Sequence, residues 1–173
     1  LKISDNKNVK NLPENIDRIF PNLQYLWASN NSLSEIQHGD LENLKNLKVL
    51  DLSDNDLSTI DPEALQGIPS LKQLDLSGNK IPLLHKDAFI NFPHLKSLDL
   101  SRNELVDLPT DVFASLPELQ KLSLASNKIS KVPENVFNRN RKLEKINLNG
   151  NRLKRIEPEI FDNLPSLAEV NLE

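Results

Sequence analysis

The chain has 173 residues and a formal net charge of −4 at pH 7, with 38% hydrophobic and 27% charged residues. These values are typical of a folded domain, and the acidic balance argues against nucleic-acid binding, which favours a broadly basic domain. The absence of cysteine excludes disulfides, cysteine-based zinc clusters and thiol nucleophiles. No apolar run reaches the roughly 18 to 20 residues of a membrane-spanning helix, so we expect no membrane span.

Residues 1–22 form an irregular first unit. Leu1-Lys2-Ile3 has the pattern of a strand end, but Asn6 and Val9 fall one position out of phase with the units that follow. We therefore expect a partial repeat in this segment.

Residues 23–166 contain six full repeats of 24 residues, which begin at Leu23, Leu47, Leu71, Leu95, Leu119 and Leu143, and Leu167 begins the partial unit that follows at the same spacing. Each repeat reads L-x-x-L-x-L-x-x-N-x-L, and its alternating centre predicts a short strand with leucines on one face. One unit cannot bury its own leucines, so the strands must stack in parallel. The return segments contain too few apolar positions for long helices, which favours short helical turns or extended chain.

The pattern thus predicts an α/β solenoid: a curved, right-handed stack with a concave parallel β-sheet and short irregular or helical convex segments. A column of asparagines follows the strands: Asn31, Asn55, Asn79, Asn103, Asn127 and Asn151. An amide side chain carries both donors and an acceptor, so each can bridge unpaired backbone groups of adjacent turns. We interpret the column as structural.

The last unit, residues 167–173, is a strand that stops before its asparagine. Solenoids need terminal caps, and neither end has a recognisable one. We expect a single domain over residues 1–173, lacking caps and representing the middle of a longer domain.

The full repeat, L-x-x-L-x-L-x-x-N-x-L-x-x-[ILV]-x-x-x-x-F-x-x-L-P-x, resembles the 24-residue "typical" subfamily of leucine-rich repeats over almost the whole chain. Proteins of this subfamily include Toll-like receptor ectodomains, insect immune leucine-rich proteins, small proteoglycans, neuronal adhesion receptors and lymphocyte receptors of jawless fish. The resemblance implies secretion or display at the cell surface. Members usually carry cysteine-rich caps, which this chain lacks, so an intracellular relative stays an alternative.

The concave face of the first repeat carries Tyr25 and Trp27, the only tyrosine and tryptophan of the chain. Large aromatic side chains on an otherwise polar strand face are costly unless something covers them, and they dominate interface energies. The predicted partner-binding residues are Tyr25, Trp27, Val49, Ser29, Asp51, Gln73 and Asp75. In the alternative interpretation, the rings seal the N-terminal end of the core.

We expect no catalytic site, metal or cofactor. His38, His85 and His94 occupy unrelated repeat positions, and no metalloprotease or phosphate-binding motif occurs. An aspartate column could invite a cation, but lysines run alongside it and offer charge compensation. The column consists of Asp51, Asp75 and Asp99, and the accompanying lysines are Lys48, Lys72 and Lys96.

A second candidate surface is electrostatic. Residues 119–155 contain ten lysines and arginines against two glutamates, a local net charge of 10 − 2 = +8. Five of these cations form a predicted lateral basic edge: Lys128, Lys131, Arg152, Lys154 and Arg155. Such an edge attracts sulfated glycans or other polyanions, although most charge runs are only a solvated flank.

Asn30-Asn31-Ser32 is the only N-glycosylation sequon, which makes Asn30 the candidate acceptor.

These features predict a non-catalytic module that binds a protein ligand or co-receptor through its concave face, outside the cell, in innate immunity or cell adhesion. A matrix scaffold that binds polyanions through the basic edge is the alternative from a different class. An intracellular scaffold is a third.

Overall fold

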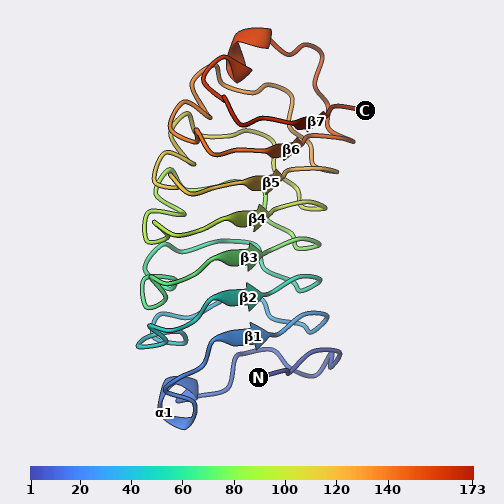
Figure 1. Ribbon diagram of the computed structural model, residues 1–173. Coiled ribbons are helices and arrows are strands. Elements are labelled where there is room, and N and C mark those ends of the chain that lie inside the picture. The colour runs from blue at the N-terminus through green and yellow to red at the C-terminus, as the bar shows by residue number, and fades with distance from the viewer.

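The computed structural model describes residues 1–173 as one solenoid of stacked turns (Figure 1). Its single sheet has seven parallel strands in sequence order. The strands are β1 (Tyr25–Trp27), β2 (Val49–Asp51), β3 (Gln73–Asp75), β4 (Ser97–Asp99), β5 (Lys121–Ser123), β6 (Lys145–Asn147) and β7 (Glu169–Asn171). Helix is confined to α1 (Ile16–Ile19) and the 3₁₀ helix η1 (Pro158–Phe161).

The register of the sheet follows the 24-residue period. Leu26 pairs with Leu50, and Leu50 pairs with Leu74. The first unit departs from it, because Lys2 bridges to Trp27, 25 residues further on. The extra residue is the physical counterpart of the phase shift at Asn6. The predicted shift at Val9 is wrong, because Val9 lies 24 residues before Leu33 and its carbonyl accepts the Ser32 N–H as Leu33 O accepts the Asp56 N–H.

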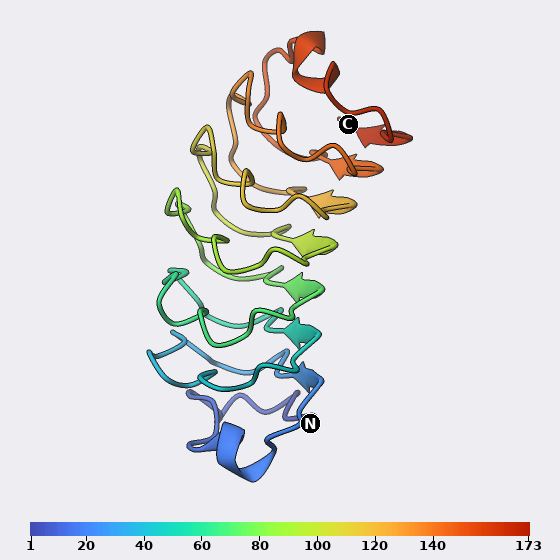
Figure 2. The same ribbon diagram turned by 60° about the vertical axis from the view of Figure 1, so that its left-hand side comes forward.

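The stack is curved, with the strands on its concave side and the return segments on the other (Figure 2). On the return side, the buried rings of Phe89, Phe113 and Phe137 stack with successive centroids 6.1 Å apart. Hydrogen-bonded strands are spaced by only about 4.8 Å. Neighbouring turns are therefore further apart on the phenylalanine side than at the sheet, and this difference bends the stack toward the sheet. The predicted curved, right-handed solenoid is confirmed.

The leucines of the strands and bends form one continuous apolar core between the sheet and the return segments. Its burial is complete in the middle turns, where Leu50 and Leu100 are fully buried. In the last strand, by contrast, Val170 is 37% exposed and the following Leu172 is 48% exposed. This difference follows from stacking, since each turn is covered by the turns on both of its sides.

The asparagine column bridges neighbouring turns as predicted. The side-chain amide of Asn79 donates to Leu76 O in its own turn and to Leu52 O in the preceding turn, both at 3.0 Å. Its Oδ1 accepts the N–H of Leu57, also at 3.0 Å. The same arrangement recurs along the column, so one side chain satisfies backbone groups of two turns at each step.

One buried polar residue was missed. Asn140 occupies a position where the other repeats carry Leu, Ile or Phe, and it is fully buried. Its amide donates to Phe113 O at 2.8 Å and to Leu116 O at 2.9 Å, while its Oδ1 has no partner. The departure from the apolar pattern at this position is visible in the sequence.

We expect Asn79→Ala to lower the free energy of unfolding by about 2 to 3 kcal/mol, because it leaves several buried backbone groups unsatisfied. Urea denaturation followed by circular dichroism measures the loss. Asn151→Ala is the matched control, because Asn151 holds the same ladder position but is only half-buried. A loss at Asn79 no larger than at Asn151 would contradict the ladder as the cause.

Candidate functional site: the concave face of strands β1 to β3

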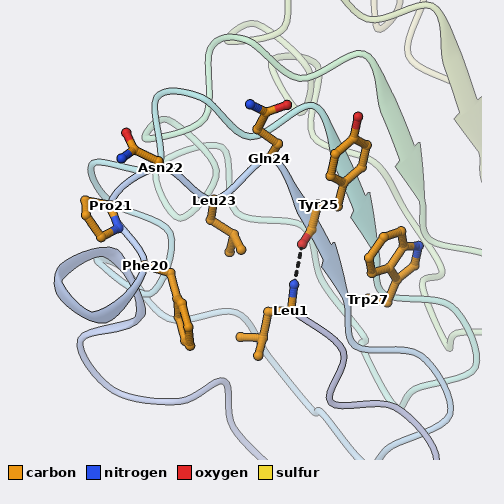
Figure 3. A pocket seen from close by; sticks show the side chains of 8 residues that line it. All are labelled: Leu1, Phe20, Pro21, Asn22, Leu23, Gln24, Tyr25 and Trp27. Atoms are coloured by element: carbon orange, nitrogen blue, oxygen red, sulfur yellow. Dashed lines mark hydrogen bonds between the residues drawn. The ribbon is translucent and has the colours of Figure 1, made fainter.

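Tyr25 and Trp27 form an aromatic pair on the concave side of strand β1. The residue between them, Leu26, is fully buried, so strand alternation places both rings on the opposite, solvent-facing side. Tyr25 is 44% exposed and Trp27 is 40% exposed. The rings are stacked, with centroids 5.6 Å apart and planes 7° from parallel (Figure 3). Each ring therefore limits the freedom of the other before any partner binds.

The aromatic pair borders a hollow of ≈ 470 Å³ at the N-terminal end of the stack (Figure 3). Leu1 and Phe20 lie on its other side, and the terminal amino group of Leu1 donates to Tyr25 O at 2.9 Å. The first unit contributes Leu12 and Ile16 to the buried core, to which neither Tyr25 nor Trp27 belongs. The two rings thus remain largely outside the core.

The sheet brings the predicted partner-binding residues together. In register, Val49 lies beside Tyr25, and Asp51 lies beside Trp27. Gln73 and Asp75 occupy the same two columns one strand further on. Ser29 follows strand β1, half-buried, with its Oγ 3.1 Å from Ser4 Oγ. The result is a surface with an aromatic end and an acidic continuation.

The aspartate column consists of the last residues of strands β2, β3 and β4, just before the turn that follows each strand. Asp51, Asp75 and Asp99 each accept, through Oδ1, the backbone N–H of the serine two residues later, at 2.9, 2.9 and 2.8 Å. Burial raises the pKa of Asp75 above its ordinary value, despite the hydrogen bonds from Ser77; the neighbouring Asp99 and Asp51 raise it further. The column is therefore an acidic stripe in which Asp75, its middle member, is costly to keep ionised.

The lysines that run alongside make no ion pair with this column. Lys48 instead donates to the side chain of Gln24 at 2.9 Å. The nearby cation is Arg102, which reaches across a whole turn: its guanidinium contacts Asp54 Oδ1 at 2.8 Å. Arg102 also interacts electrostatically with Asp75 and Asp99, so it compensates the far end of the column.

Gly78 makes this long-range ion pair possible. It lies between Asp54 and Arg102 in the stack, and a Cβ on it would collide with Asp54 Oδ1. All three residues have positive φ at the tight bend before a ladder asparagine. The sequence signal was Asp, Gly and Arg in one column at 24-residue spacing, which was not recognised.

Two of the five cations of the predicted basic edge form ion pairs within the chain. Lys128 pairs with Glu104 at 2.8 Å, and Arg155 pairs with Glu157 at 2.6 Å. Glu104 and Lys128 belong to a column of acidic and basic residues that alternate at 24-residue spacing. The column begins with Asp56 and Lys80, which are 2.7 Å apart. The predicted cations of this edge without an ion pair are Lys131, Arg152 and Lys154.

Asn30 is exposed at the rim of the concave face. It lies in the left-handed region with φ 53°, and its amide donates to Asp5 Oδ1 at 3.1 Å.

No group of three or more His, Cys, Asp or Glu side chains is arranged to hold a metal ion. None of the helices is long and apolar enough to cross a membrane.

A model described as "Leucine rich repeat" matches residues 21–81, 83–129 and 117–173, and thus most of the chain. The chain belongs to the leucine-rich repeat family. The family and the fold are those of protein- or ligand-binding modules that are typically non-enzymatic. A search of curated proteins found no match.

Two solved structures resemble this leucine-rich repeat chain. TLR13, solved in complex with the single-stranded RNA ssRNA13, is 31% identical with a TM-score of 0.93. The similarity covers 100% of this chain and 25% of that one. A leucine-rich repeat protein of Leptospira interrogans is 32% identical with a TM-score of 0.74, covering 86% of this chain and 37% of that one. The chain thus spans well under half the length of either.

We expect Asp75→Asn to raise the melting temperature at neutral pH. The raised pKa means that the folded state holds this proton more tightly than the unfolded state, so ionisation destabilises the fold. An asparagine keeps the turn, because Asn147 Oδ1 accepts the N–H of Asn149 at an equivalent position.

The gain should shrink as the pH falls through the raised pKa of Asp75 in the folded state, and it should vanish below the ordinary aspartate value of 3.8, where the wild-type carboxyl is protonated in both states. Thermal unfolding of both proteins between pH 7 and pH 3 measures this difference. Asp111→Asn, at an exposed position without an ion pair, is the control. A lower melting temperature for Asp75→Asn at pH 7 would contradict the electrostatic account.

Proposed function

We propose that this chain is a non-catalytic recognition module that binds a protein partner through the concave face of strands β1 to β3. The observation that carries the proposal is the exposed, stacked pair of Tyr25 and Trp27 on a face whose other residues are mostly polar. Buried aromatic anchors of this kind contribute disproportionately to interface energies. The family supplies the general role, and the aromatic pair supplies the site.

The pair is suited to anchoring because it is held in place before binding. Both rings project from a strand whose backbone is hydrogen-bonded on either side, to Leu1–Ile3 and to strand β2. The rings also stack on each other. Little side-chain entropy is then lost when a partner covers them, which favours affinity.

We further propose that the module acts outside the cell, in innate immunity or cell adhesion, as a secreted protein or part of a surface receptor. The similarity to TLR13 supports a receptor context. In that setting Asn30, exposed at the rim, is the acceptor for an N-linked glycan that would border the aromatic pair.

We expect Trp27→Ala to weaken partner binding by about 2 kcal/mol or more, roughly 30-fold in Kd, while leaving the melting temperature nearly unchanged. A photo-crosslinking residue at Val49, which lies beside Tyr25, first captures the partner. Calorimetry with that purified partner then compares the variants.

Ile90→Ala is the matched control, because Ile90 is an exposed apolar residue on a return segment and should leave affinity unchanged. A large loss of thermal stability with intact affinity in Trp27→Ala would favour the alternative, in which the rings seal the end of the core.

A second candidate function is polyanion binding through the basic edge. It is favoured by Lys131, Arg152 and Lys154, which have no carboxylate partner while the neighbouring Lys128 and Arg155 do. Unpaired cations attract sulfated glycans and nucleic acids through a salt-dependent field. The structural similarity to TLR13, solved with an RNA, keeps a nucleic acid among the polyanions to be tested.

We expect Arg152→Glu with Lys154→Glu to abolish retention on heparin and binding of a single-stranded oligonucleotide, if this edge binds polyanions. The control, Lys10→Glu with Lys45→Glu, makes the same change in net charge at exposed positions of the first two units. Wild-type binding should fall steeply with salt. Equal retention of both double variants would eliminate the basic edge as the site.

A further inference from the structure

We propose that the concave site receives a guanidinium group of its protein partner, stacked on Trp27 and paired with Asp51. This inference rests on the proposed function and specifies which chemistry the partner must present. It depends on three features of the site: the open face of the indole, the direction of the Asp51 carboxylate, and the distribution of charge along the sheet.

The indole of Trp27 has one covered face. Tyr25 stacks on that face with nearly parallel planes, so the opposite face looks along the strand toward Ser29. No other aromatic or cationic group of the chain stacks on this second face, and Trp27 is 40% exposed. An aromatic face that is exposed and uncovered attracts cations, and the indole of tryptophan attracts them more strongly than the rings of tyrosine or phenylalanine do.

The carboxylate of Asp51 leans in the same direction. It lies beside Trp27 in the sheet register, at a strand spacing of about 4.8 Å. Its Oδ1 accepts hydrogen bonds from the N–H and the hydroxyl of Ser53, at 2.9 and 2.7 Å, which draws the carboxyl along the strand. Its Oδ2 makes no hydrogen bond or ion pair within the chain. A cation on the open face of Trp27 would therefore have a carboxylate oxygen within reach.

The charge around Asp51 is not balanced by the protein itself. Arg102 is held by Asp54 and lies nearer the Asp75 and Asp99 end of the column. The lysine closest in sequence, Lys48, is hydrogen-bonded to Gln24. Lys2, which flanks Trp27 on the side away from Asp51, is the other cation at this end, and its ammonium lies 3.8 Å from the carboxylate of Asp5. Asp51 itself therefore has no ion-pair partner within the chain. Burial also disfavours the ionised form of Asp75, a cost that a cation bound nearby would reduce.

A guanidinium fits this combination better than an ammonium does. It is planar and weakly hydrated, so it stacks on an aromatic face while its edge donates to a carboxylate. An anionic group would be repelled here. Apart from Lys2, which lies near Asp5, the cations on the strands of this face are Lys121 on strand β5 and Lys145 on strand β6, and Lys145 is already paired with Glu169 at 2.7 Å.

The test uses Trp27 as its own reporter, because it is the only tryptophan of the chain. Two short, capped glycine peptides are titrated against the full chain while its fluorescence is recorded. One peptide contains two arginines, and the other contains citrulline at the same positions, which removes the charge but keeps the shape. We expect a saturable fluorescence change with the arginine peptide and binding weaker by about tenfold with the citrulline peptide.

The decisive variant is Asp51→Asn, which keeps the reporter and retains an acceptor for the Ser53 N–H. We expect it to reduce affinity for the arginine peptide about tenfold, whereas Asp111→Asn, away from the face, has no effect. Equal responses to the two peptides, an unchanged Asp51→Asn variant, or no saturable response would each overturn the proposal. A response of Trp27 to a single-stranded oligonucleotide but not to the arginine peptide would also overturn it, in favour of base stacking.

The outcome is separable from that of the proposed function. If Trp27→Ala weakens the captured protein partner while the arginine peptide fails, the concave face binds protein through other chemistry. If Trp27→Ala leaves the partner unaffected, the proposed function itself is wrong, whatever the peptides show.

Discussion

The bend that follows each strand is the part of the fold on which the rest depends. Backbone groups there face the interior and cannot all find partners within their own turn, and burying them unpaired is expensive. A side-chain amide at a fixed position meets this need for two turns at once, as Asn79 does between Leu52 and Leu76. Because each amide must meet the turn before it, the period cannot drift. The constant period then aligns every other position into a column.

Because the period is constant, residues that are 24 positions apart in the sequence lie next to each other on the surface. A residue type repeated every 24 positions becomes a stripe on the sheet, and a single exception becomes a localised feature. Three aspartates in one column produce an acidic stripe in which burial raises the pKa of the middle member, Asp75, and Gly78 lets Arg102 reach Asp54 and compensate one end. At the other end, Asp51, which lies beside Trp27, has no ion-pair partner within the chain. The same acidic residues thus lower the stability of the fold and offer a surface to a partner.

The columns themselves could be predicted from the sequence, because they require only the period and strand alternation. The solenoid, the parallel sheet, the asparagine ladder and the exposure of Trp27 all follow from these two rules. Contacts made by long side chains could not be predicted in this way, because each depends on rotamers and on the residues it passes. The Arg102–Asp54 pair skips a turn, and the Lys128–Glu104 pair neutralises a cation counted as part of the basic edge.

A solenoid also constrains where binding affects the fold. Each turn contacts only its neighbours, so a turn near an end has fewer interactions to lose when it opens locally. The proposed site lies across strands β1 to β3, where the first unit is already irregular. A partner that bridged these strands would connect turns that otherwise cooperate only through nearest-neighbour contacts. Binding that requires the turns to be ordered stabilises them by an amount that grows with the logarithm of the partner concentration divided by Kd. Recognition at this face would therefore stabilise strands β1 to β3, and the irregular first unit that is hydrogen-bonded to strand β1, against local opening.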